Sequence, residues 1–249
     1  SFRGLNGNIH SSTYMYEYFE KLKDSYGAVD EIIFYGAGIK GEGGRLILKS
    51  ILGHFGVKPE IHSDMLAVCR ALLQKESGHC FILGTGANAC FYDGEKIIEN
   101  RSGHGIILGD EGSGAYLGKL FIQDILNEKA PIHIIKEFRD TFQLTNQDII
   151  DQVYHGEGLS TWLGQFAKYI VVRKGDVYIK NLIERNFNDF FSSTVASFQK
   201  EVKKMHLNGG FVFALQEEFK ELAKEKNIDV EMVVQRSIEL LEDYHFSEK

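Results

Sequence analysis

Gly84–Gly86, with the sequence GTG, has the composition of an anion-binding turn. It falls between two short apolar segments that we expect to be strands. Two glycines and a hydroxyl residue in such a turn expose several backbone N–H groups in one direction, and a concave group of this kind binds phosphate oxygens. Taken alone, the segment is more simply interpreted as a plain hairpin turn.

A second glycine-rich segment, Gly105–Gly114, strengthens the phosphate interpretation. Its sequence is GIILGDEGSG, and an expected helix starts directly after it, near Ala115. Helix N-termini attract anions through their unpaired N–H groups and the macrodipole. Asp110 or Ser113 could instead cap this helix. The segment holds more glycine than a cap needs, so we predict that it belongs to a binding site.

Asp64 is the candidate general base. It follows a brief extended stretch over 60–62 and precedes a helix expected to start near Met65. One interpretation is an N-cap aspartate. The other is a carboxylate at a strand end, where open α/β sheets place ligands and where it can accept a proton from a bound hydroxyl. The two roles are compatible with each other.

The elements that must position these residues alternate at first between helix and strand. Apolar spacing predicts helices over 14–26, 45–55 and 65–74, with short strands over 31–35 and 60–62, so we expect a parallel α/β arrangement. The rhythm then changes to an antiparallel meander over 79–83, 89–92 and 96–99. Further helices are predicted over 115–127, 132–142, 146–154, 159–172, 176–205, 213–226 and 230–245, and a short apolar element, 206–213, is interrupted by Gly209 and Gly210.

Four motifs in this order resemble the N-acetylglucosamine kinase branch of the BadF/BadG/BcrA/BcrD ATPase family, within the sugar kinase, Hsp70 and actin superfamily. They are Tyr35–Gly38, Ser63–Ala67, Ile82–Gly86 and, most specific, Leu108–Gly114. The resemblance covers nearly the whole chain. It implies a two-lobed α/β fold of the actin-like ATPase (ribonuclease H-like) type, with an N-terminal lobe over 1–78 and a C-terminal lobe over 79–229. The helix expected over 230–247 is a candidate addition to the first lobe.

The resemblance also implies an activity, namely transfer of the γ-phosphate of ATP, with Mg²⁺, to a hydroxyl of N-acetylglucosamine or a related amino sugar in the cleft between the lobes. Asp64 resembles the base that deprotonates this hydroxyl, and no metal ligand is assigned. The residues that resemble the ATP-phosphate loop are Gly84, Thr85 and Gly86, those on the adenosine side are Gly209 and Gly210, and the sugar contacts are Asn6, Asp64, Gly103, His104, Gly105 and Asp110.

Three departures from the family pattern keep alternatives open. The family's first phosphate hairpin, an Asp-Gly-Gly-Gly-Thr-Lys-Thr-like turn, is not among these 249 residues, so we expect a further segment before Ser1. Ala87 stands where a serine is usual, and His104 where an aromatic or aliphatic residue is common. The alternatives are a non-catalytic sugar or nucleotide sensor and an ATPase activator of a radical dehydratase, which would hold an iron–sulfur cluster through cysteines.

Composition narrows the classes of protein further. There are 28 basic and 35 acidic residues and a net charge of −7, which argues against general nucleic-acid binding. No apolar run approaches the roughly 18 residues of a membrane span. Cys69, Cys80 and Cys90 match neither a disulfide framework nor a zinc site, so we expect a cytoplasmic protein with core thiols. The related kinases are often homodimers, and the resemblance extends this expectation to the present chain.

Overall fold

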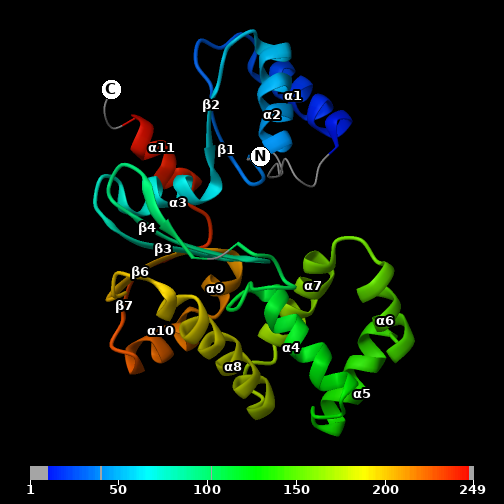
Figure 1. The fold of residues 1–249 in the computed structure, drawn as a ribbon. Coiled ribbons are helices and arrows are strands. Elements are labelled where there is room, and N and C mark those ends of the chain that lie inside the picture. The colour runs from blue at the N-terminus through cyan, green and yellow to red at the C-terminus, as the bar shows by residue number, and fades with distance from the viewer. Residues whose placement is uncertain (1–10, 40, 102, 247–249) are drawn as a thin grey trace. The chain divides into compact units, whose positions relative to one another are not determined.

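The computed structural model describes residues 11–39, 41–101 and 103–246 (Figure 1). The chain divides into two compact units, Ser1–Arg70 and Ala71–Lys249, with the division inside helix α3 (Asp64–Leu73). The lobe border at 78/79 stays a prediction. None of the helices in the described ranges combines the length and hydropathy that crossing a bilayer requires.

The first unit is a small parallel sheet with two helices packed on it. Strands β1 (Ile33–Gly36) and β2 (Glu60–Ser63) run parallel, in a register that sets Gly36 opposite Ser63. The amphipathic helices are α1 (Ser12–Tyr26) and α2 (Gly41–Phe55). Their core is formed by Met15, Phe19, Ile47 and Ile51, all nearly or fully buried. Because the strands are parallel, their carboxyl ends lie side by side, and Asp64 follows one of them.

The second unit is built on one five-stranded sheet in the order β5-β4-β3-β6-β7. The first three strands form the predicted antiparallel meander, and β3, β6 and β7 run parallel to one another. The strands are β3 (Gly78–Leu83), β4 (Ala87–Tyr92), β5 (Ile97–Asn100), β6 (Lys204–Asn208) and β7 (Asp229–Val234).

Most helices of this unit lie on one side of the sheet and extend beyond it (Figure 1). Alternate apolar residues of the strands, among them Phe81, Leu83 and Leu207, are fully buried with the aromatic residues Phe187 and Phe190 in a single large core. The helices of this unit are α4 (Gly114–Leu126), α5 (Ile132–Phe142), α6 (Asn146–His155), α7 (Leu159–Val171), α8 (Val177–Ser193), α9 (Gly210–Ala214), α10 (Gln216–Glu225) and α11 (Ile238–Phe246), with a short 3₁₀ turn η1 (Val195–Ser197).

Three predicted helices over the C-terminal part of the chain are wrong in extent. The helix expected over 176–205 ends at Ser193, where the hydroxyls of Ser192 and Ser193 donate to the Asp189 carbonyl and compete with the helical backbone bonds. The helix expected over 213–226 is two helices, α9 and α10, broken at Leu215. The third, 230–245, begins as strand β7, since pairing with β6 overrides a helix-like spacing of valines.

Candidate active site

The Gly84–Gly86 turn is hydrogen-bonded to the start of helix α4. The N–H of Gly114 donates to the Gly84 carbonyl at 2.8 Å, and the N–H of Ala115 donates to the Thr85 carbonyl at 3.0 Å. The described chain contains no cis peptide bond, and in a trans peptide the N–H points opposite to the C=O. The N–H groups of Thr85 and Gly86 therefore both point away from α4, as a phosphate-binding turn requires.

The N-terminus of α4 itself is occupied by protein groups. The Ser113 hydroxyl accepts from the N–H of Tyr116 at 3.1 Å, and the Ser113 carbonyl accepts from Leu117. Together with the bonds of Gly114 and Ala115, these use all four N–H groups of the first turn. The sequence predicted Ser113 as a possible cap, and it is one. The expected anion attraction of this helix end is replaced by a structural link to the Gly84–Gly86 turn.

A pocket of about 720 Å³ within the second unit adjoins this turn. This volume suits a small-molecule ligand. The pocket brings Gly84 and Thr85 together with Gly210, about 125 residues further along the chain by the printed sequence. Its lining is mostly small and apolar, with one cation and one amide, and consists of Gly84, Thr85, Gly114, Gly164, Ala167, Lys168, Val171, Val172, Gly210, Phe211, Ala214 and Gln235.

Gly209 packs directly against the strand that leads into the turn. Its N–H donates to the Val234 carbonyl at 2.9 Å, and its φ of +143° is one that residues with a side chain rarely adopt. A Cβ at this position would lie 2.3 Å from the Leu83 carbonyl oxygen and 3.1 Å from the Gly84 nitrogen. Only glycine therefore allows β6 to end this close to the Gly84–Gly86 turn.

Asp110 connects the second glycine-rich segment to the same turn. Its side chain is 7% exposed, and its Oδ1 accepts from the N–H of Ala87 at 3.2 Å. A Cβ on Gly86 would lie 3.3 Å from Oδ2 of this carboxylate. Burial raises the pKa of Asp110, and the N–H of Ala87 opposes this rise. Ala87, noted as a departure from the family pattern, thus contributes its backbone to the site.

The raised pKa of Asp110 predicts a pH-dependent contribution to stability. The folded protein holds this proton more tightly than the unfolded chain, so Asp110 stabilises the fold at low pH, and that contribution is lost as pH rises through the raised pKa. Asp110→Asn keeps a carbonyl oxygen for Ala87 but cannot ionise. We expect the free energy of unfolding of wild type minus that of the variant to fall as the pH rises above about 4, the ordinary value for an aspartate. Urea denaturation at a series of pH values measures this difference. A difference that does not change with pH would exclude a raised pKa for Asp110.

The segment Gly103–Gly105 lies near Asp110. Both glycines have positive φ, and His104 is exposed, with its Nδ1 3.7 Å from the position that a Cβ on Gly109 would take. A protonated His104 would oppose the rise in the pKa of Asp110. The fold thus gathers the predicted sugar contacts of the second unit.

Two polar side chains beside this cluster, Asn88 and Glu111, were not among the predicted sugar contacts. Asn88 lies next to Gly103, since its Oδ1 is 3.7 Å from the position of a Cβ there. The Glu111 carboxylate adjoins Gly109, and its charge raises the pKa of Asp110. Their positions in the sequence could have identified them as site candidates, because Asn88 follows the GTG turn by two residues and Glu111 follows Asp110 directly.

In the first unit, Asp64 is not the N-cap of helix α3, one of the two roles that the sequence allowed. The Ser63 hydroxyl accepts from the N–H of Leu66 at 3.2 Å, so Ser63 is the residue that caps α3. Asp64 Oδ1 accepts from the N–H of Met65 at 2.8 Å. Its side chain is half-buried, and this burial raises its pKa against the effect of the N–H. Asn6, the other predicted sugar contact, lies outside the described residues.

Neither a protein-family model nor a curated protein matches the chain. Among solved structures, a proposed N-acetylglucosamine kinase from Porphyromonas gingivalis matches 97% of this chain and 88% of its own, with a TM-score of 0.88 and 29% identity. The resemblance to N-acetylglucosamine kinase-like proteins is confirmed. A second proposed N-acetylglucosamine kinase, from Chromobacterium violaceum, matches 86% of this chain and 78% of its own at a TM-score of 0.63 and 16% identity, and so shares the fold.

These comparisons also confirm the fold prediction. The chain has the α/β, actin-like ATPase fold of N-acetylglucosamine kinase-like proteins. The family motifs predict a site in this fold at the Gly84–Gly86 turn, the Asp110 segment and Asp64.

Proposed function

We propose that this chain is an ATP-dependent sugar kinase that transfers the γ-phosphate to a hydroxyl of N-acetylglucosamine or a related amino sugar. The observation that carries the proposal is the pocket that joins Gly84 and Thr85 to Gly210. It has the size and the apolar lining that a nucleotide base and ribose need, next to a turn whose N–H groups suit phosphate. The similarity to proposed N-acetylglucosamine kinases supports the choice of acceptor.

In this proposal the nucleotide lies along the pocket with its phosphates at the Gly84–Gly86 turn. The N–H groups of Thr85 and Gly86 hold phosphate oxygens, and the exposed Lys168 ammonium on the pocket wall adds positive charge. Phosphoryl transfer depends more on such positioning and charge neutralisation than on covalent chemistry. Gly210, Phe211 and their neighbours in the pocket lining contact the adenosine.

Asp64 takes the proton of the acceptor hydroxyl. A carboxylate whose pKa is raised by burial is a better base near neutral pH than an ordinary aspartate. The sugar is held by the groups near Asp110, with Gly103, His104 and Gly105 as further contacts and Asn6 as a contact that the family motif suggests. Loss of the proton to Asp64 leaves the sugar oxygen free to attack the γ-phosphorus, with ADP as the leaving group.

Mg²⁺ would enter with the nucleotide. This ion keeps several waters and is commonly held by substrate phosphates and one or two carboxylates, without a dedicated protein cage. No group of three or more metal-ligating side chains occurs among the described residues. Asp110, whose Oδ2 lies 3.3 Å from the position of a Cβ on Gly86, and Glu111, the next residue, are carboxylates that could contribute, and the ion would neutralise charge on the phosphates.

Filling the pocket is expected to weaken nucleotide binding. Ala214 ends α9, lines the pocket and is exposed, so Ala214→Phe places a ring in the pocket without disturbing the core. We expect the Kd for Mg-ATP, measured by calorimetry, to rise by about tenfold or more. Ala196→Phe, at an exposed alanine outside this lining, is the matched control and should bind like wild type. Equal affinities for both variants would place the nucleotide elsewhere.

A further inference from the structure

Helix α8 holds the loop that carries Asp110. The Oδ1 of Asn186 accepts from the N–H of Gly112 at 3.2 Å. One turn later on the same helix, Phe190 packs on this glycine so closely that a Cβ there would lie 2.8 Å from the Phe190 Cβ. Gly112 also has a φ of +83°. The loop backbone is thus fixed at Gly112 by a hydrogen bond and by a side chain that leaves no room for another residue.

A buried asparagine at position 186 costs stability that an apolar side chain would not. It is fully buried, and its Nδ2 has no hydrogen-bond partner among the described residues. Its amide cannot be turned round, because the NH₂ group would then face the N–H of Gly112, donor against donor. A leucine would fill the same space without a buried, unsatisfied donor. The feature that only the polar side chain supplies is the acceptor for Gly112.

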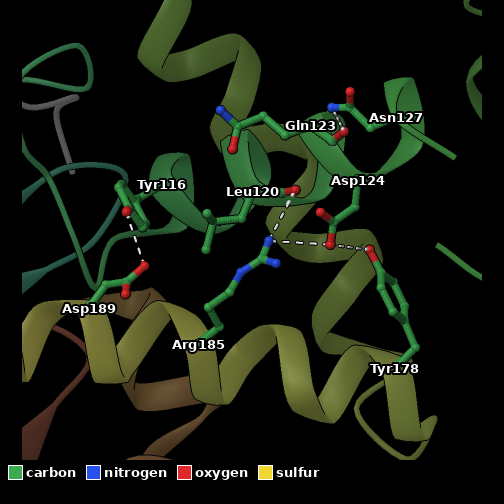
Figure 2. A network of polar contacts seen from close by, with 8 residues as sticks. All are labelled: Tyr116, Leu120, Gln123, Asp124, Asn127, Tyr178, Arg185 and Asp189. Atoms are coloured by element: carbon green, nitrogen blue, oxygen red, sulfur yellow. Dashed lines mark hydrogen bonds and ion pairs between the residues drawn. The ribbon is translucent and has the colours of Figure 1, made fainter. Parts of the chain in front are cut away.

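The neighbouring turns of α8 hold helix α4, which follows the loop (Figure 2). The Tyr116 hydroxyl donates to the Asp189 carboxylate at 3.1 Å, and burial beside that charge raises the pKa of Tyr116 to about 12. Further along, Arg185 pairs with the buried Asp124 at 3.3 Å, and Asp124 also accepts from the Tyr178 hydroxyl at 3.1 Å. These contacts fix α4 and α8 to each other on the C-terminal side of the loop.

We propose that Asn186 is a positioning residue for phosphoryl transfer, and this inference rests on the proposed function. Through Gly112 it fixes the short backbone stretch between Asp110, on the proposed sugar side, and Gly114, whose N–H holds the Gly84–Gly86 turn. Asn186 touches neither substrate. It keeps the proposed sugar-binding residues and the phosphate turn in one fixed arrangement. Holding the reactants in a fixed geometry lowers the barrier to reaction.

The test compares three variants of the full-length protein. Asn186→Leu keeps the size and removes the acceptor, Asn186→Asp keeps an acceptor oxygen, and Leu182→Ala weakens the same helix at a buried residue away from the loop. We expect Asn186→Leu to lower kcat by about tenfold or more, with KM for sugar and ATP changed less than about threefold. Asn186→Asp should restore much of kcat, and Leu182→Ala should lower the melting temperature with kcat near wild type.

Hydrogen exchange of the peptide that contains Gly112 separates this inference from the proposed function. Exchange there should accelerate at least about tenfold in Asn186→Leu and stay slow in Asn186→Asp. Wild-type kcat and slow exchange in Asn186→Leu would overturn the inference. A wild-type protein without sugar-dependent ADP release would overturn the proposed function and the catalytic part of this inference together, whereas fast exchange in Asn186→Leu would still support the anchor at Gly112.

Discussion

Asp64→Asn is expected to lower kcat for sugar phosphorylation by about 10²- to 10⁴-fold, the usual contribution of a positioned general base. The amide cannot accept the hydroxyl proton, although its carbonyl oxygen can still accept from the N–H of Met65. The fold should therefore be preserved, and KM for the sugar should change far less than kcat. Steady-state kinetics with circular dichroism as the check on folding measures both.

A matched variant separates catalysis by Asp64 from capping of α3. Ser63→Ala removes the hydroxyl that accepts from Leu66, which costs about 1 kcal/mol of stability and should leave kcat near wild type. Because burial raises the pKa of Asp64, the acid limb of kcat/KM should also lie above the value of about 3.9 for an ordinary aspartate. Phosphorylation at the wild-type rate by Asp64→Asn would remove Asp64 from the mechanism.

Gly209→Ala is the second change with a large expected effect, on stability and nucleotide binding together. The new methyl would stand 2.3 Å from the Leu83 carbonyl oxygen, on a backbone with φ of +143°. Strain and overpacking of this kind lower the free energy of unfolding by roughly 2–5 kcal/mol. Relief of the clash must push β6 away from the Gly84–Gly86 turn, so the Kd for Mg-ATP should rise as well. Urea denaturation and calorimetry measure the two effects.

Gly210→Ala provides the control one residue later. A Cβ on Gly210 meets no atom within 4 Å, and the residue begins helix α9. Alanine at a position whose backbone it can adopt stabilises a protein by about 0.4–1 kcal/mol. We therefore expect Gly210→Ala to unfold at the same or a higher urea concentration than wild type. Equal destabilisation by both variants would contradict the close packing at Gly209.

The parts of the fold that the sequence predicted well are those set by local chemistry. The predicted meander over 79–83, 89–92 and 96–99 turns between β4 and β5 at Asp93 and Gly94, where the Asp93 carboxylate accepts from the N–H groups of Glu95 and Lys96 and Gly94 has a positive φ. Ser113 caps α4 as its position before the helix suggested. Such turns and caps involve residues within a few positions of one another, so the sequence displays them directly.

Strand β7 shows the opposite case. Val230, Val233 and Val234 recur at helix-like spacing, and the apolar pattern continues into α11. β7 is a parallel edge strand in which every residue is partly or fully exposed, so no clean alternation marks it. Its conformation is set by pairing with β6, which is remote in the sequence. The spacing of nearby residues cannot predict that pairing.

The candidate site divides in the same way. The motifs identified Asp64, Asp110 and the Gly84–Gly86 turn as site candidates, because residue types suited to phosphate and proton transfer stand beside glycines and element ends. They did not show that Asn186, 74 residues after Gly112, supplies the acceptor that fixes this loop. An isolated asparagine inside a helix has no distinguishing pattern, so its role became visible only in the packed structure.

The most direct test of the account is to identify the products formed from Mg-ATP and an amino sugar. The full-length protein should be incubated in turn with N-acetylglucosamine, glucosamine and N-acetylmuramic acid, followed by mass spectrometry of the sugar and quantification of ADP. We expect at least one of these sugars to gain a single phosphoryl group and ADP to appear in equal amount. ATP that binds but stays intact with every sugar, or ADP formed without a phosphorylated sugar, would contradict it.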